Sequence, residues 1–178
     1  TEALAMRRRL FGENHPDVEE SLQGLANHYL RKGDDARAES YYRQTIAVDE
    51  RIYGRDHSHL ALTLNDLAGL LEKRDAVEDA LSMRERAVEI REQAVGPKDS
   101  LLASFLFNLA GSRRSLSRPA LAEVDLRRAL EALPEPAESG GIGLINALVL
   151  LPEVEYLNLR CHLVVPFAWR KTPAIPVS

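Results

Sequence analysis

The chain of 178 residues is long enough for one domain with a substantial core, and its composition, 45% hydrophobic and 28% charged, is ordinary for a globular protein. A formal net charge of −4 provides no positive field of the kind that attracts nucleic acid, so no nucleic-acid partner is expected. The longest apolar run, at 142–151, is about half of a membrane span, and no membrane association is expected. A lone cysteine, Cys161, rules out an intrachain disulfide framework, and the expected location is the cytoplasm.

A period of 42 residues organises most of the chain. Three stretches align without a gap: LFGENHPDVEESLQGLA (10–26), IYGRDHSHLALTLNDLA (52–68) and AVGPKDSLLASFLFNLA (94–110). Gly12, Gly54 and Gly96 share one repeat column, by which we mean positions spaced by 42 residues. Several leucine and alanine columns keep the same register, which indicates a true structural repeat.

The chain begins inside a repeat. Residues 3–11 align with 45–53, so 1–12 is predicted to be the second helix of a preceding unit. Terminal units of a solenoid normally carry polar caps, and we therefore expect the chain to be a fragment of a longer array. The run Arg7–Arg9 is interpreted as a solvated helix face, because consecutive residues point about 100° apart around a helix.

The first full repeat, 13–54, is predicted to be a pair of helices. Apolar residues from Val18 to Tyr29 follow the spacing of one helical stripe, and Pro16 suits the first turn. Gly33 is expected to end this helix, with Asp34 or Asp35 capping the next one. Small residues at 26 and 38 predict a close approach of the two helix backbones.

The pattern continues through the second repeat, 55–96, and the third, 97–134, with local departures. Asp75 stands in the glycine column of the turn, and Arg84 and Arg113 stand in aromatic columns. A degenerate helix of a fourth repeat is predicted over 135–152, where Pro152 should end it. An irregular cap or a poorly ordered tail is predicted over 153–178.

The pattern resembles the tetratricopeptide repeat. The family's columns fall on Leu25, Ala26, Tyr29, Gly33, Ala38, Tyr42 and Thr45. The 42-residue period and the G-x-x-H-P lead-in are similar to the long repeats of kinesin light chains, and bacterial signalling proteins carry similar arrays. The resemblance implies an all-α, right-handed superhelix of antiparallel helix hairpins, with about three repeats and partial units at both ends.

Three histidines lie at the starts of the first and second repeats. His15, His57 and His59 could be metal ligands or general bases, but the third copy replaces the histidine by Asp99, another capping residue. We interpret the junctions as helix caps, and no catalytic residue, metal or cofactor is predicted. A metal-dependent or hydrolytic enzyme that uses these histidines remains an alternative. The neighbouring Asp56, His57 and Ser58 cannot form a catalytic triad, since consecutive residues cannot reach one another as a triad requires.

The resemblance also implies a concave face, lined by the first helix of each repeat, that holds an extended peptide. The residues in the groove columns are Gln23, Asn27, Arg31, Asn65, Lys73 and Arg114. Amides can pair with a peptide backbone and cations with carboxylates, although a merely solvated helix face is the alternative. We predict a non-enzymatic scaffold or adaptor that binds a protein or peptide within a larger signalling or regulatory protein. No small-molecule substrate is expected, and a structural or self-associating spacer is the alternative function.

Overall fold

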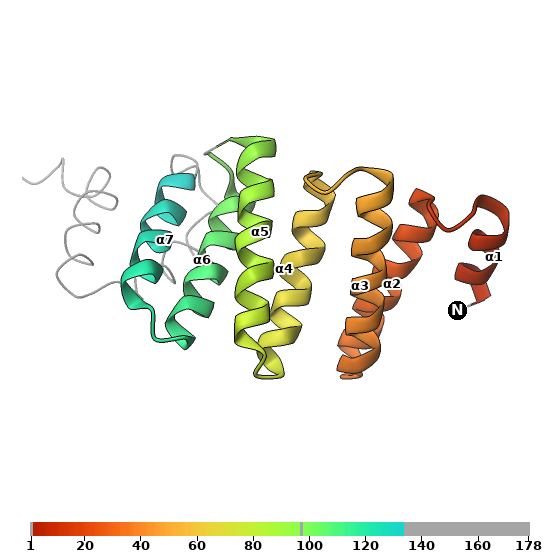
Figure 1. The fold of residues 1–178 in the computed structure, drawn as a ribbon, viewed down its shortest axis with the longest axis horizontal. Coiled ribbons are helices and arrows are strands. Elements are labelled where there is room, and N and C mark those ends of the chain that lie inside the picture. The colour runs from red at the N-terminus through yellow and green to blue at the C-terminus, as the bar shows by residue number, and fades with distance from the viewer. Residues whose placement is uncertain (1, 97, 134–178) are drawn as a thin grey trace, which may run out of the picture. The chain divides into compact units, whose positions relative to one another are not determined.

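The structure, a computed structural model, describes residues 2–96 and 98–133 and contains seven helices and no strand in that part of the chain (Figure 1). The helices are α1 (Glu2–Phe11), α2 (Pro16–Arg31), α3 (Asp35–Ile52), α4 (Ser58–Lys73), α5 (Val77–Val95), α6 (Ser100–Ser115) and α7 (Pro119–Ala132). The predicted helix at 143–151 and the predicted tail at 153–178 lie outside the described residues. None of the described helices is long and apolar enough to cross a membrane.

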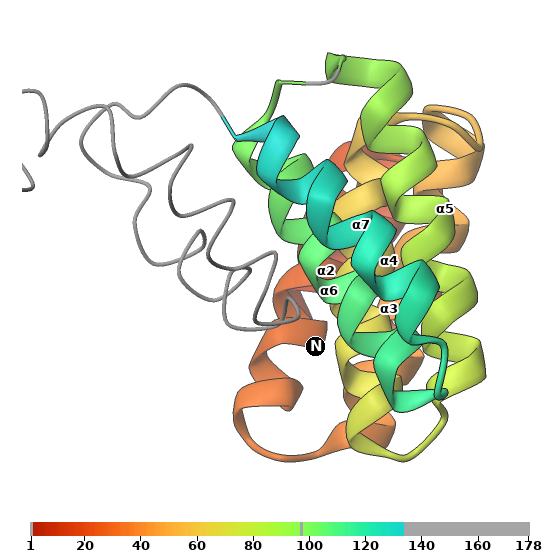
Figure 2. The ribbon, with the colours of Figure 1, turned by 90° about the vertical axis from the view of Figure 1, so that its left-hand side faces the viewer.

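Each helix packs against the next one in the chain, and the closest pairs are α2 with α3, α4 with α5, and α6 with α7. Figures 1 and 2 show these pairs as three helix hairpins that follow one another, with α1 before the first. The predicted solenoid of helix hairpins is therefore confirmed for the described residues.

The small residues lie where each hairpin closes. Ala26 and Ala38 are completely buried, as are their repeat-column equivalents Ala68 and Ala80 in the second hairpin. All four belong to one apolar cluster, together with Tyr42. The burial of these alanines in one cluster confirms the predicted close approach of the two helix backbones. A larger side chain at these positions would separate the helices.

One turn geometry joins the two helices of every hairpin. In each hairpin, the backbone carbonyl of the third residue from the end of the first helix accepts a hydrogen bond from the backbone N–H five residues later. In the first hairpin, Asp34 N donates to Tyr29 O (3.0 Å). The equivalent bonds run from Ala76 N to Leu71 O (3.0 Å) and from Arg118 N to Arg113 O (2.8 Å). This is a Schellman motif, which requires a residue in the left-handed region. Gly33, Asp75 and Ser117 occupy that position, with φ of 75°, 64° and 56°.

The junctions between repeats are caps, as predicted. His15 Nδ1 accepts a hydrogen bond from Asp17 N (3.2 Å), and His57 Nδ1 accepts one from His59 N (3.4 Å). Asp99 caps α6 in the third repeat by accepting from Leu102 N (2.8 Å). These side chains satisfy backbone N–H groups that the first turn of a helix leaves unpaired.

The junctions have a second component that the sequence pattern did not suggest. Phe11 stacks on His15, and Tyr53 stacks on His57, with ring centroids 4.5 and 4.7 Å apart. In the third copy the histidine is absent and the aromatic column holds Val95. Aromatic ring and histidine are thus present together or absent together at the three junctions.

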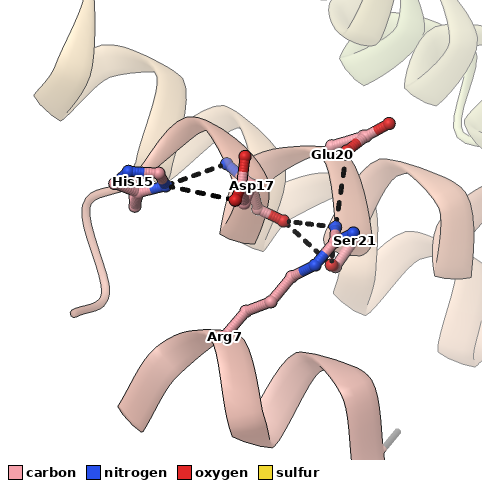
Figure 3. A network of polar contacts seen from close by, with 5 residues as sticks. All are labelled: Arg7, His15, Asp17, Glu20 and Ser21. Carbon is pink, nitrogen blue, oxygen red and sulfur yellow. Dashed lines mark hydrogen bonds and ion pairs between the residues drawn. The ribbon is translucent and has the colours of Figure 1, made fainter. Parts of the chain in front are cut away.

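The interpretation of Arg7 as part of a solvated face is wrong. Arg7 donates from α1 to the Asp17 carbonyl oxygen (2.9 Å) and to Ser21 Oγ (2.7 Å) at the start of α2, and it pairs with Glu20 (Figure 3). The guanidinium reaches these acceptors because α1 packs against α2. The arginine therefore ties the first helix to the first hairpin.

Candidate functional site

The six predicted groove residues lie on the first helices of the hairpins. Gln23, Asn27 and Arg31 are on α2, Asn65 and Lys73 are on α4, and Arg114 is on α6. They divide into side chains that are engaged in packing and side chains that remain open to a ligand.

Gln23 and Asn27 are engaged inside the array. Asn27 Oδ1 accepts a hydrogen bond from the Tyr42 hydroxyl (2.7 Å), which links the two helices of the first hairpin. Burial raises the pKa of Tyr42 to about 12, so its hydroxyl remains protonated and keeps donating. Gln23 Oε1 accepts from Thr63 Oγ1 (3.4 Å) and so links α2 to α4. Both amides therefore help to position helices.

Asn65 and Lys73 lie at the edge of a hollow of about 260 Å³ between successive first helices. Its lining comes from α2, α4, α5 and α6 and comprises Leu30, Asn65, Asp66, Gly69, Leu70, Lys73, Arg84 and Asn108. The structure thus brings two of the predicted groove residues together. It adds Asp66, Arg84 and Asn108, which the sequence did not single out as groove residues.

Gly69 keeps this hollow open. It occupies the repeat column of Asn27, so the position that carries an amide in the first repeat has no side chain in the second. A Cβ at Gly69 would meet nothing within 4 Å, and its backbone is helical. The space beside Gly69 is therefore free for a ligand or for a substituted side chain.

The amides in the hollow are only partly satisfied. Asn108 Nδ2 donates to Asn65 Oδ1 (3.2 Å). Within the described part of the chain, the Asn65 amide nitrogen and the Asn108 amide oxygen make no further hydrogen bond. The Asn65 NH2 group and the Asn108 amide oxygen thus remain available to a ligand, and a peptide backbone offers the complementary acceptor and donor.

A buried cation forms the floor of the hollow. Arg84, whose side chain is 8% exposed, donates from one nitrogen to Glu72 Oε1 (2.5 Å), the Asn108 carbonyl oxygen (2.7 Å) and Ser112 Oγ (2.5 Å). Arg84 stands in the column of Tyr42. The second and third hairpins are therefore joined by a polar network at a position where the first hairpin uses an aromatic ring.

The remaining predicted cations differ in their contacts. Lys73 Nζ pairs with Asp35 across the first and second hairpins (3.2 Å). Arg31 and Arg114 are exposed and make no side-chain hydrogen bond or ion pair with the described residues. All three lie in the last turn of a first helix, where a cation also favours the negative end of the helix dipole.

The chain is similar to one known protein family and to several solved structures. The family model described as tetratricopeptide repeat matches residues 1–51 and 59–135. No curated protein matches the chain in sequence.

Solved structures with the same fold include kinesin light chain repeats. BtubC (BKLC) from P. vanneervenii is 24% identical with a TM-score of 0.67, over 78% of this chain and 58% of that one. A putative kinesin light chain of Podosopora anserina with nearly identical TPR-like repeats is 16% identical with a TM-score of 0.70, over 91% and 77%. The N-terminal domain of stress-induced protein-1 from C. elegans has a TM-score of 0.58 at 16% identity, over 75% and 94%. The chain spans little more than half of the BtubC chain.

Proposed function

Because the chain belongs to the tetratricopeptide repeat family, we propose that its described part is a non-enzymatic segment that binds a peptide or protein partner along α2, α4 and α6. Repeats of this family are generally protein–protein interaction modules and are generally not enzymes.

The hollow beside Gly69 is the observation that carries the proposal. It combines open volume with an Asn65 amide donor and an Asn108 amide oxygen that have no further partner among residues 2–96 and 98–133. An extended peptide exposes one N–H and one C=O at each residue, so it can satisfy both groups. The Arg84 network beneath holds Asn108 by its carbonyl oxygen, which supports a preformed site.

The ligand that fits this face is an extended peptide with a carboxylate at one end of the contact. Arg31 and Arg114 are exposed and have no ion-pair partner in the part of the chain that the structure describes, and Lys73 lines the hollow. Arginine can bind a carboxylate through two parallel hydrogen bonds, which gives direction as well as affinity. As the resemblance to signalling arrays implies, we place the segment in a larger signalling or regulatory protein of the cytoplasm.

The test is selection of ligands from a random peptide library displayed on phage, with the purified chain as bait. Selected peptides are synthesised and titrated against three variants. Gly69→Gln places a side chain in the hollow, starting from a Cβ that meets nothing within 4 Å, and Asn65→Ala removes the open donor. Ser82→Gln inserts the same side chain at an exposed position of α5, two residues from Arg84 and so on the other side of that helix.

The selected peptides are expected to bind Gly69→Gln and Asn65→Ala at least about tenfold more weakly than the parent, a difference of about 1.4 kcal/mol. Their affinity for Ser82→Gln should be unchanged. The proposal is overturned if no peptide is enriched, or if Gly69→Gln binds the selected peptides as tightly as the parent. Sedimentation velocity distinguishes the spacer alternative, which predicts a self-associated array that selects no peptide.

A further inference from the structure

Three chemically active side chains from three different helices meet on the first inter-repeat interface, away from the hollow. They are Glu19 on α2, Asp49 on α3 and His59 on α4. One ligand atom of each lies within 4.8 Å of the others. We call this set the three-helix cluster.

Asp49 is the unusual member of the cluster. Its residue is 1% exposed, and both carboxylate oxygens are buried without a hydrogen-bond partner among the described residues. A buried carboxylate without a partner is costly, and burial raises the pKa of Asp49 to about 6. Asp49 also contributes to raising the pKa of Glu19, which burial raises first. The two acids therefore lie close enough to disfavour each other's charge, and His59 only partly offsets this effect on Glu19.

The repeat itself does not require these residues. The equivalents 42 positions later, at the next interface, are Ala61, Arg91 and Leu101. There the cluster is replaced by two apolar residues and by an arginine that pairs with Asp99 (2.9 Å). Helix packing can therefore be achieved at this place without a carboxylate in any of the three columns. The cluster at the first interface is a local addition to the fold.

We propose that Glu19, Asp49 and His59 bind a divalent transition-metal cation, for which zinc is the probe. Two ionised carboxylates balance the +2 charge of such an ion, and an imidazole with two carboxylates is a donor set that zinc accepts in proteins. The cation would supply the partner that both oxygens of Asp49 lack. A partly exposed His59 leaves a path for the ion to enter.

The side chains need a small adjustment to close around an ion. Ligand atoms at about 2.1 Å from zinc in a tetrahedral site lie about 3.4 Å apart, so the cluster must contract by roughly an ångström. Asp49 is fixed by burial, whereas Glu19 is half-buried and His59 is exposed. Rotation of these two side chains can bring their ligand atoms toward Asp49.

This site differs from the junction histidines considered in the sequence. His15 and His57 use Nδ1 to cap helices, whereas the His59 side chain accepts no hydrogen bond from a backbone N–H of the described residues. The proposed site therefore does not depend on a His-x-His pair. It also stands independently of peptide binding, because none of its members lines the hollow.

The experiment is calorimetric titration of zinc chloride into the metal-stripped chain, in a background with Cys161→Ser and His162→Ala. That background removes a thiol and an imidazole, outside the described residues, that could bind zinc by themselves. Glu19→Gln, Asp49→Asn and His59→Ala are the site variants. His15→Ala and His28→Ala are controls that remove an imidazole elsewhere, and circular dichroism checks that each variant is folded.

One equivalent of zinc is expected to bind, and each site variant should weaken binding at least about tenfold while both controls leave it unchanged. Zinc should also raise the melting temperature of the parent and of the controls, but not of Asp49→Asn, which is expected to fold because it removes a buried charge. Absence of one-to-one binding would overturn the proposal. So would binding that persists in both Glu19→Gln and His59→Ala.

Discussion

Asp75 adopts, with φ of 64°, the left-handed backbone that Gly33 adopts 42 residues earlier with φ of 75°. Both residues close a helix hairpin with the same hydrogen-bond pattern. Only glycine enters this region without a steric cost, although aspartate tolerates it better than most residues. The second turn therefore carries a strain that the first turn lacks, and so does the third at Ser117.

Replacing Ser117 by glycine is expected to raise the free energy of unfolding by about 0.5–1 kcal/mol, and Asp75→Gly by a smaller amount. The reverse change, Gly33→Ala, should lower it by about 1 kcal/mol, since a Cβ there meets no neighbour and only the backbone cost remains. Urea unfolding followed by circular dichroism measures all three. Destabilisation by Ser117→Gly would contradict this account.

Stability of the metal-free chain should depend on pH through Asp49. The pKa of this carboxyl is about 6 in the folded chain against an ordinary value of 3.8, so between these values the folded state binds more protons than the unfolded state. The free energy of unfolding therefore falls as pH rises from about 4 to about 6, by up to about 3 kcal/mol. In EDTA at pH 7.5, Asp49→Asn is expected to be more stable than the parent by about 1–3 kcal/mol. Thermal melts from pH 4 to pH 8 check this, and equal pH profiles for the two proteins would refute it.

Breaking the Arg84 network should be costly. Glu72→Ala leaves a buried guanidinium without its counter-charge and is expected to cost about 2–4 kcal/mol. A double-mutant cycle with Arg84→Met measures the coupling between the two side chains, which should be about 1–3 kcal/mol. Arg43→Ala is the control, because Arg43 forms an exposed pair with Glu39 within α3 and should change stability by less than about 0.5 kcal/mol. Coupling near zero between Arg84 and Glu72 would show that this ion pair does not stabilise the second hairpin.

His57 is expected to stabilise the chain as a cap and through its stack on Tyr53. His57→Ala should cost about 1–2 kcal/mol, whereas His57→Asp, the residue type of the third junction, should cost less because it can still cap. The exposed His28 on α2 provides a matched control, with an expected effect of His28→Ala within about 0.5 kcal/mol. Melting temperatures at pH 8 rank the three variants, and equal losses for His57→Ala and His57→Asp would assign the stabilisation to the stack alone.

The sequence correctly predicted the positions whose side chains make their contacts within a single repeat. Gly33 ends α2, Asp34 caps α3 by accepting from Arg37 N (3.1 Å), and Ala26 and Ala38 are buried in the hairpin. Each of these positions is decided by neighbours within about a dozen residues, so the periodic pattern contains the information. The capping role of His57 was also predictable, because the third copy replaces it by Asp99.

Contacts between repeats could not be predicted from the sequence pattern. Arg84 was noticed as a departure, but its partner Ser112 lies 28 residues away in the next repeat and meets it only when the second and third hairpins pack. Its other partner, Glu72, lies on the other helix of the same hairpin. The three-helix cluster has the same origin, since three helices supply its three members. For the groove, position in the repeat singled out Asn65 and Lys73, and both line the hollow. It could not reveal that Asn27 would be bonded to Tyr42 or that Gly69 would leave the space open.

The Schellman turns have a consequence for how the chain unfolds. Each hairpin is closed by hydrogen bonds that span only six residues, and every described helix makes its main contacts with its immediate neighbours in sequence. Such local contacts favour rapid formation of a hairpin and allow partial opening from one side. Hydrogen exchange should therefore divide the protein into blocks whose borders coincide with Gly54 and Gly96, each block opening with its own free energy.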